Sequence, residues 1–410
     1  MSSSHQEEFA RRVVQQLRHA GFEALFAGGC VRDLLMGNEA SDYDVATSAT
    51  PEQVRELFGK KRTIAVGAAF GVMIVLGPNK AAGQVEVATF RTDATYSDGR
   101  RPDSVTYSTP EHDAQRRDFT INGMFYDPLA EEVIDFVGGR ADLERKVIRA
   151  IGDPAARISE DKLRMLRAVR FAARFDFQIE DATREAVRAS ANQVSVVSGE
   201  RIAVEVQKTL STAQAAWAVQ EWQELGLLLS IFPEIAQRWN DRQGVFRQVL
   251  EAAQCEAWQV IVAAMYVIAQ AQESQLTALK ASLKLSNTDA EAIRFAVLKH
   301  AFLLEANNKK WSEVQPLVVN SHFASALKVL QLTESCYGAS GAAAELAARK
   351  EAVSELDPEP LLLGQDLIDS GLKPGPEFKR LLEHARDLQL DGELDSKLEA
   401  LQWLKRRIGK

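Results

Sequence analysis

Two glycines and two aspartates near the N-terminus constrain the fold more than any other part of the chain. They lie in the segment 27–46, AGGCVRDLLMGNEASDYDVA. The run 23–27 predicts a short strand, and Gly28 and Gly29 allow a tight turn into a helix that stops at Gly37. The free N–H groups at the start of that helix suit an anion, with Arg32 one turn further on to pair a phosphate oxygen. The segment therefore predicts half of a triphosphate site.

The other half is the pair Asp42 and Asp44. Alternate residues of a strand point the same way, so the two carboxylates lie side by side while Tyr43 and Val45 face elsewhere. Two such charges repel each other unless a hard cation lies between them, and Mg2+ bound by carboxylates and substrate phosphates meets that need. An acidic surface turn is the alternative for an isolated pair of this kind.

The residues around this segment predict a mixed α/β domain that ends near residue 138. Apolar residues at helical spacing predict an opening helix over 9–17, and Thr50, Pro51 and Gln53 form a strong helix start. Three β-branched stretches, 63–66, 71–76 and 84–89, predict strands separated by turn residues. Glu86 lies in the last of them and is either an exposed polar position or a third carboxylate that holds metal or accepts a proton.

The glycine turn followed by the paired aspartates resembles the nucleotidyltransferase head of the class II, bacterial-type tRNA CCA-adding enzymes and the related bacterial poly(A) polymerases. The resemblance implies an α+β chain, with a polymerase beta-like head followed by an all-α neck, body and tail. The expected divisions are a catalytic head at 1–138, a base-selecting neck at 139–210, a body at 211–285 and a tRNA-binding tail at 286–410. Its motifs are dense over residues 25–210 and patchy beyond.

The segment 116–122, RRDFTIN, matches that family's RRDxxxN motif. Asp118 and Asn122 could hydrogen-bond ribose hydroxyls and so select a ribonucleotide, and Arg117 could pair with phosphate. The alternative is a helix start at which Asp118 is favoured by the helix dipole.

A net charge of −8 argues against a nucleic-acid partner, but many of the basic residues are concentrated in one segment and can form a local basic face. The segment 140–174 holds a cluster of them: Arg140, Arg145, Lys146, Arg149, Arg157, Lys162, Arg164, Arg167, Arg170 and Arg174. A helix is expected to begin at Ser159 and to carry Asp161, Arg164, Arg167 and Arg170 along one drifting stripe. Most such stripes are solvated faces, but here the EDxxR element matches the family's nucleotide-selecting motif.

Asp161 and Arg164 have the right chemistry for base selection. Cytosine and adenine each present an amino donor beside a ring-nitrogen acceptor, so a carboxylate beside a guanidinium complements both bases. Uracil and guanine present the reverse and would leave buried polar groups unpaired. Arg167 and Arg170 are expected to meet triphosphate or primer phosphates instead.

The remaining motifs predict structure around this site. Gly138 and Gly139 are expected to form a hinge, the polar segment 92–108 a mobile loop, and the ERIxxE element from Glu200 an intrahelical brace. Beyond residue 205 the chain predicts successive helices with breaks near Gly226, Pro233, Gly244, the pair 286–287 and Pro358. The tail segment 360–376 predicts a helix, a tight turn and a helix that either is structural or contacts RNA phosphate. The helix over 257–269 lacks the His-Asp pair of some longer relatives, so no phosphohydrolase activity is expected.

These observations predict a template-independent enzyme that adds CMP and AMP to tRNA 3′ ends from CTP and ATP with Mg2+. A poly(A) polymerase and a specialised CC- or A-adding enzyme stay open; the segment 66–72, VGAAFGV, lacks an arginine-rich turn and favours the tRNA substrate. A small-molecule nucleotidyltransferase would not need the basic neck, and an inactive RNA-binding relative would not keep both aspartates. Three widely spaced cysteines and the lack of a leader or a long apolar stretch predict a cytoplasmic protein without a membrane partner; the oligomeric state is left open.

Overall fold

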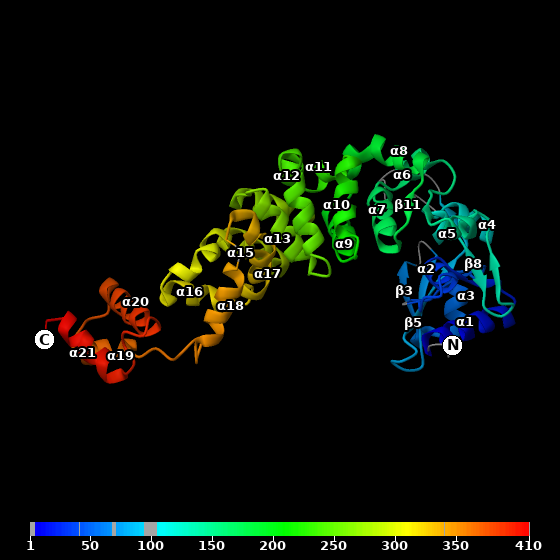
Figure 1. Ribbon diagram of the computed structural model, residues 1–410. Coiled ribbons are helices and arrows are strands. Elements are labelled where there is room, and N and C mark those ends of the chain that lie inside the picture. The colour runs from blue at the N-terminus through cyan, green and yellow to red at the C-terminus, as the bar shows by residue number, and fades with distance from the viewer. Residues whose placement is uncertain (1–4, 41, 68–70, 94–104, 340, 410) are drawn as a thin grey trace. The chain divides into compact units, whose positions relative to one another are not determined.

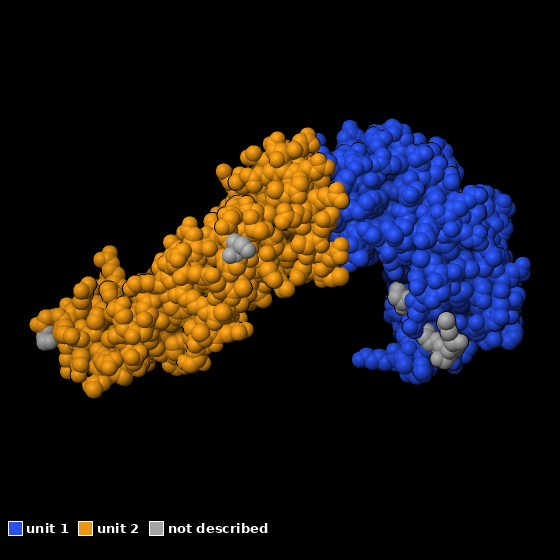
Figure 2. Space-filling view, in the orientation of Figure 1, with its two compact units in different colours: residues 1–233 blue, residues 234–410 orange. Residues whose placement is uncertain are grey.

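The computed structural model describes residues 5–40, 42–67, 71–93, 105–339 and 341–409. The chain divides into two compact units, residues 1–233 and 234–410 (Figures 1 and 2). Each unit has its own architecture and is described separately. Among the described residues, no helix is both long enough and apolar enough to cross a membrane.

The first unit is built on a seven-stranded mixed sheet with the strand order β3-β4-β5-β2-β1-β8-β9. The neighbours β2 and β5 run parallel, and the other neighbouring strands pair antiparallel. The sheet strands are β1 Ala24–Ala27, β2 Asp44–Thr47, β3 Thr63–Gly67, β4 Val72–Leu76, β5 Gln84–Thr89, β8 Phe125–Asp127 and β9 Glu132–Ile134. A separate pair, β6 Arg91–Asp93 and β7 Val105–Tyr107, follows β5. The predicted mixed head is therefore confirmed.

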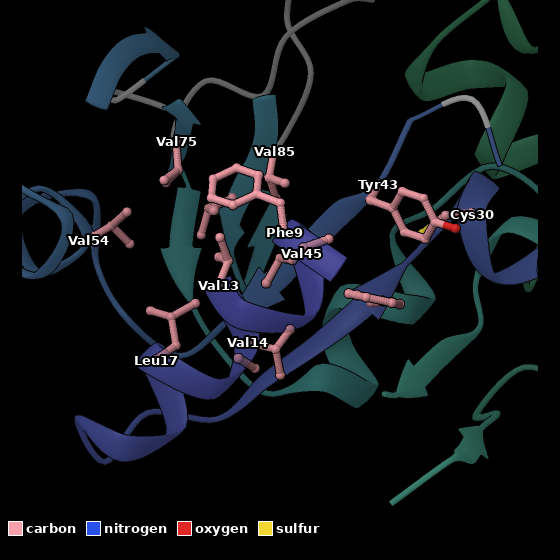
Figure 3. Close-up of a cluster of buried hydrophobic side chains, with 14 of the residues drawn as sticks. Phe9, Val13, Val14, Leu17, Cys30, Tyr43, Val45, Val54, Val75 and Val85 are labelled. Atoms are coloured by element: carbon pink, nitrogen blue, oxygen red, sulfur yellow. The ribbon is translucent and has the colours of Figure 1, made fainter. Parts of the chain in front are cut away.

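One face of this sheet is covered by the opening helices. Helix α1 His5–His19 turns Phe9, Val13 and Leu17 onto the sheet, and α3 Pro51–Phe58 adds Val54 (Figure 3). Each such apolar side chain contributes roughly 1.5–3 kcal/mol when fully buried. Helix α3 begins with the capping box that the sequence predicts, because Thr50 accepts a hydrogen bond from the Gln53 backbone N–H.

Alternation along the strands leaves the other face for the site. In β2, Val45 is fully buried in the core beneath α1, whereas Asp44 is exposed on the opposite face. Three short helical segments border that face: α2 Gly29–Leu35, α4 Pro110–Gln115 and η3 Thr120–Asn122. The sheet thus places Asp44 of β2 and Glu86 of β5 side by side on one accessible surface.

Helices make up most of the rest of the first unit. They are α5 Gly139–Glu144, α6 Pro154–Glu160, α7 Arg164–Phe175, α8 Asp181–Ser190, α9 Gly199–Leu210, α10 Ala215–Glu224 and α11 Leu227–Ile231. The expectation of an all-helical neck is wrong in one detail, since β10 Val147–Ile148 and β11 Gln178–Ile179 form a short parallel pair. Strands of two residues are too short to give a periodic signal.

The described part of the second unit is helical. Its helices are α12 Pro233–Ala252, α13 Trp258–Ile268, α14 Glu273–Leu283, α15 Asn287–Leu304, α16 Trp311–Val318, α17 Phe323–Thr333, α18 Ala342–Ala352, α19 Gly364–Asp369, α20 Pro376–Leu390 and α21 Lys397–Arg407. The break expected near Gly244 lies at Arg242, where α12 kinks and the backbone leaves the helical conformation, with φ −133° and ψ 19°. The predicted helix, turn and helix of the tail motif are α19 and α20. The four-part division of the chain stays a prediction, and α13 packs against α15 and α17 across its boundary at residue 285.

Candidate active site

The glycine turn between β1 and α2 forms one wall of a cavity of about 530 Å³. Gly28 has a φ of +73°, a conformation that L side chains rarely adopt. A Cβ atom there would lie 3.0 Å from Nη1 of Arg117 and 4.0 Å from Oδ2 of Asp44. Gly28 therefore lets the backbone approach both a cationic and an anionic side chain, as a metal-phosphate site requires.

The predicted side-by-side arrangement of Asp42 and Asp44 is supported by the burial of their neighbours. Tyr43 is 4% exposed and Val45 is fully buried, whereas both aspartates are exposed and line the cavity. Glu86 lies beside Asp44 on the adjacent parallel strand.

The charges around Asp44 create a place for a cation. Although Asp44 opens onto the cavity, the surrounding protein excludes much of the water from its carboxylate. This loss of solvation and then the nearby charge of Glu86 raise the pKa of Asp44 to about 6; Arg117 opposes this shift and Asp42 adds to it. A divalent cation would relieve the same repulsion, so the donor set fits the metal that nucleotidyltransferases generally use. Among the described residues, no group of three or more histidines, cysteines, aspartates and glutamates could hold a metal ion. These side chains allow a metal ion to be coordinated by two carboxylates together with phosphate oxygens of the substrate.

Arg117 is aimed at the glycine turn by a carboxylate that the sequence analysis overlooked. Asp113 of α4 is buried, and its Oδ2 accepts hydrogen bonds from Nε and Nη2 of Arg117 at 3.2 and 2.9 Å. Its Oδ1 accepts two more from Arg116 at 2.9 and 2.7 Å. Burial alone would raise the pKa of Asp113, but the two arginines lower it, so the carboxylate stays ionised. The spacing of three and four residues to Arg116 and Arg117 was the available signal.

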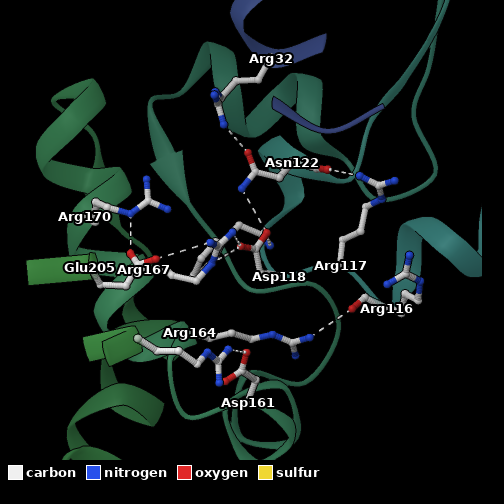
Figure 4. Close-up of polar contacts among 12 residues, drawn as sticks. Arg32, Arg116, Arg117, Asp118, Asn122, Asp161, Arg164, Arg167, Arg170 and Glu205 are labelled. Atoms are coloured by element: carbon white, nitrogen blue, oxygen red, sulfur yellow. Dashed lines mark hydrogen bonds and ion pairs between the residues drawn. The ribbon is translucent and has the colours of Figure 1, made fainter. Parts of the chain in front are cut away.

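Asp118 and Asn122 line the cavity and are bonded to each other (Figure 4). Nδ2 of Asn122 donates to Oδ1 of Asp118 at 3.1 Å, and Nη1 of Arg32 donates to Oδ1 of Asn122 at 2.5 Å. Arg32 is only 4% exposed and also bonds Asp33 through Nε and Nη2. Arg32 thus orients Asn122, and its contact with phosphate stays a prediction, as do the ribose contacts of Asp118 and Asn122.

A chain of alternating charges connects Asp118 to the neck helices. Arg167 of α7 donates to Oδ2 of Asp118 from Nε and Nη2 at 2.9 and 2.5 Å, and Glu205 of α9 bonds Nε of Arg170 at 2.5 Å. Glu205 also lies 3.8 Å from Nη1 of Arg167. Glu205 of the ERIxxE element therefore braces α7 from the neighbouring helix α9, and the expected charged network within α9 stays a prediction.

Asp161 and Arg164 both line the cavity, but they do not share a helix. The helix expected to begin at Ser159 is interrupted: Ser159 lies inside α6, Asp161 ends α6 with extended backbone, and α7 begins at Arg164. Oδ1 of Asp161 accepts from the Leu163 N–H at 3.1 Å, a local bond that competes with continued helix. That bond explains the break.

Each of the two side chains has its own anchor. Oδ2 of Asp161 accepts from Nη2 of Arg201 at 2.7 Å, and Nη1 of Arg164 donates to Glu160 at 2.8 Å. Arg164 also bonds the carbonyls of Arg157 and Arg116, at 2.8 and 3.2 Å. Arg201 and Glu160 were not assigned to the site from the sequence, although both belong to the matched motifs.

The segment expected to act as a hinge is closely packed. Asp135 accepts hydrogen bonds from the N–H groups of Val137, Gly139 and Arg140. A Cβ atom on Gly139 would lie 2.2 Å from the Thr120 carbonyl oxygen, so Gly139 permits close contact of two segments. Hinge motion stays a prediction. The loop expected over 92–108 and the segment 66–72 lie partly outside the described residues, which omit 94–104 and 68–70.

The mixed sheet, the glycine turn and the paired aspartates define a nucleotidyltransferase. Comparison with family models gives two matches: residues 24–149 match the poly A polymerase head domain, and residues 176–238 match a region described as a probable RNA and SrmB-binding site of polymerase A.

Similar proteins extend the match over nearly the whole chain. A CCA-adding enzyme of Levilactobacillus brevis is 32% identical over 405 residues, which is 96% of each chain. One of Limosilactobacillus fermentum is 34% identical over 398 residues, covering 96% of this chain and 95% of the relative. The crystal structure of the Bacillus stearothermophilus CCA-adding enzyme in complex with CTP aligns with a TM-score of 0.79 and 29% identity, covering 98% of this chain and 97% of that one. The chain belongs to the family of bacterial-type CCA-adding enzymes.

Proposed function

We propose that this protein adds CMP and AMP, without a nucleic-acid template, to the 3′ ends of tRNA from CTP and ATP, with release of pyrophosphate. The observation that carries the proposal is the single cavity that brings together the glycine turn, the two aspartates and the pair Asp161 and Arg164. The first two elements serve nucleotidyl transfer in general. The third supplies the selection of two bases out of four.

The phosphate end of the cavity is formed by the first unit's sheet and α2. The Gly28 N–H is bonded to the Met124 carbonyl at 3.3 Å, so the Gly29 N–H faces the triphosphate, and Arg117 pairs with one of its oxygens. Mg2+ held by Asp42 and Asp44 would neutralise phosphate charge and lower the pKa of the attacking 3′-hydroxyl. Burial raises the pKa of Glu86, which moves this carboxylate toward the range where it can accept the hydroxyl proton.

The base end of the cavity keeps hydrogen-bonding capacity for a nucleotide. Asp161 accepts two bonds in the structure, and a carboxylate has about four acceptor sites, so it can also accept from an amino group. Arg164 uses three of its five N–H groups on Arg157, Glu160 and Arg116, which leaves Nε and one Nη2 hydrogen for a ring nitrogen. Arg201 and Glu160 hold these two side chains in place and leave their recognition capacity free.

A cytoplasmic location and the assignment of the tail to tRNA binding belong to the same proposal. Cys30, Cys255 and Cys336 are all free thiols, as is usual in a reducing compartment. In this proposal, the turn between α19 and α20 presents backbone N–H groups to a phosphate of the tRNA.

Transfer to RNA and transfer to a small molecule are separated by one experiment. Purified protein is incubated with Mg2+, each of the four labelled nucleoside triphosphates and either tRNA lacking its 3′ CCA or a panel of aminoglycosides. Incorporation of CMP and AMP into tRNA alone is expected. Asp44→Asn serves as the control for contaminating activity. Labelling of a small molecule with none of the tRNA would refute the proposed function.

A further inference from the structure

A second cavity, of about 510 Å³, adjoins the nucleotide cavity. Arg170 and Arg174 of α7 line both cavities. The other walls come from the last turn of α9 and the residues that follow, and include Gln207, Lys208, Ser211 and Thr212. The second cavity is thus a continuation of the site past the arginine end of α7, and nothing in the transfer reaction described above uses it.

The charge of the second cavity is uncompensated. Among the residues that the structure describes, its lining includes no aspartate or glutamate. Arg170 is neutralised by Glu205, but Arg174 and Lys208 are exposed and form no ion pair with any residue that the structure describes. The guanidinium of Arg174 rests 5.2 Å from the centre of the Phe175 ring. Arg174 and Lys208 therefore line this cavity without an acidic partner among the described residues.

The end of α9 opposes an anion only weakly. The C-terminus of a helix carries about half a negative charge, against two full positive charges on Arg174 and Lys208. Two carbonyls of the last turn of α9 are moreover occupied, because the hydroxyls of Ser211 and Thr212 donate to the carbonyls of Gln207 and Thr209 at 2.8 and 2.7 Å. The two hydroxyl oxygens keep lone pairs, but the balance of the lining is cationic.

We propose that this second cavity binds a phosphodiester group of the RNA acceptor strand, close to the 3′ end that receives the nucleotide. The inference rests on the proposed function and names a contact for its RNA substrate. Its walls after α7 fall inside residues 176–238, which match the region described as a probable RNA-binding site, whereas the phosphate end of the nucleotide cavity falls inside 24–149. A phosphate group derived from the nucleotide, such as the released pyrophosphate, has the same chemistry and is the alternative ligand for this cavity.

The test compares Lys208→Gln and Arg174→Gln with the matched control Lys61→Gln. Lys61 is an exposed lysine of the head that lines neither cavity and has no ion pair with a described residue. Filter binding of full-length protein to tRNA lacking CCA, at several salt concentrations, gives the Kd and its salt slope. Steady-state transfer gives the KM for CTP and inhibition by pyrophosphate.

Each of the two variants is expected to raise the Kd for RNA by about 3- to 10-fold and to reduce the slope of log Kd against log salt by about 0.7–0.9. For Lys208→Gln, whose side chain lines the second cavity alone, the KM for CTP should stay within about 2-fold of wild type. Lys61→Gln should change neither the Kd for RNA nor its salt slope. An unchanged Kd and slope would overturn the inference. The inference would also be overturned if the variants showed weaker inhibition by pyrophosphate and a higher KM for CTP while RNA binding stayed intact. That result would assign the cavity to nucleotide phosphate. If the wild-type protein transfers no nucleotide but the two variants still weaken RNA binding and reduce its salt slope, the proposed function is refuted and the RNA-binding role of the cavity is supported.

Discussion

The ion pair between Asp118 and Arg167 permits a quantitative prediction for Asp118→Asn. The Asp118 side chain is 12% exposed and the Arg167 side chain 31%. Burial alone would raise the pKa of Asp118, but the charge and hydrogen bonds of Arg167, with help from Asn122, lower it from 3.8 to about 2. Asparagine keeps the shape of the side chain and removes its charge, and its amide oxygen can still accept from the Phe119 N–H and from Asn122, so the main loss is the ion pair with Arg167.

The pKa difference gives the size of the effect. A fall from 3.8 to about 2 corresponds, at about 1.36 kcal/mol for each pH unit, to roughly 2 kcal/mol of stability. Because the pKa is lower in the folded protein, this contribution is fully present above the unfolded value and is lost as the pH falls toward about 2. Asp118→Asn should therefore cost about 2 kcal/mol, and the cost should be the same at about pH 5.5 and about pH 7.5.

Hydrogen exchange of α7 and α9 peptides at increasing urea reports on the first unit by itself, which matters because a chain of two units need not unfold in one step. The control is Glu185→Gln, which removes an ion pair with Arg188 whose side chains are 67% and 43% exposed. Such an exposed pair should contribute less than about 0.5 kcal/mol. The reasoning is refuted if Asp118→Asn costs no more than the control, or if its cost disappears between the two pH values.

Three further predictions concern transfer. Asp42→Ala or Asp44→Ala should abolish it, and a variant that keeps more than about a tenth of wild-type turnover, a loss below roughly 1.4 kcal/mol, would show that the aspartate does not hold metal. Asp161→Ala and Arg164→Ala should increase the use of UTP or GTP relative to CTP by about 5- to 150-fold, from an unpaired-group penalty of about 1–3 kcal/mol; selectivity equal to that of wild type would move base recognition elsewhere. Burial and then Glu86 raise the pKa of Asp44 to about 6, so protons should compete with Mg2+ below that pH and the metal concentration for half-maximal transfer should rise as the pH falls. Glu86→Gln should move this rise to lower pH, and an identical pH profile in the variant would contradict coupling between the two carboxylates.

Local sequence signals predicted the head well, because its elements have short-range causes. The capping box at Thr50, the alternation of Asp44 with buried neighbours and the positive φ at Gly28 depend on a few adjacent residues. The break between α6 and α7 also has a local cause, the bond from Leu163 N–H to Asp161. It was missed because the residues that follow are good helix formers, and propensity favoured one continuous helix over a side-chain bond.

The partners of the site residues could not be predicted in the same way. Arg201 reaches Asp161 across 40 positions, and Glu205 reaches Arg170 across 35. Such contacts depend on how α7 and α9 pack, which neither periodicity nor spacing specifies. Several arginines expected to face phosphate are consequently paired inside the protein, while Arg174, noted only as part of a basic segment, lacks an acidic partner among the described residues.

The identity of the product tests the central claim most directly, because the motifs of nucleotidyl transfer are shared by enzymes with different outputs. Wild-type protein is given tRNA that ends at the discriminator base, and the products are resolved to single nucleotides. CTP alone should add two residues and stop, and CTP with ATP should add a third and stop, since the growing 3′ end must change which base Asp161 and Arg164 can accept. Long adenylate tails with ATP alone would contradict the account in favour of a poly(A) polymerase. Arrest after two C residues in the presence of ATP, or transfer only to tRNA already ending in CC, would identify a CC- or A-adding enzyme instead.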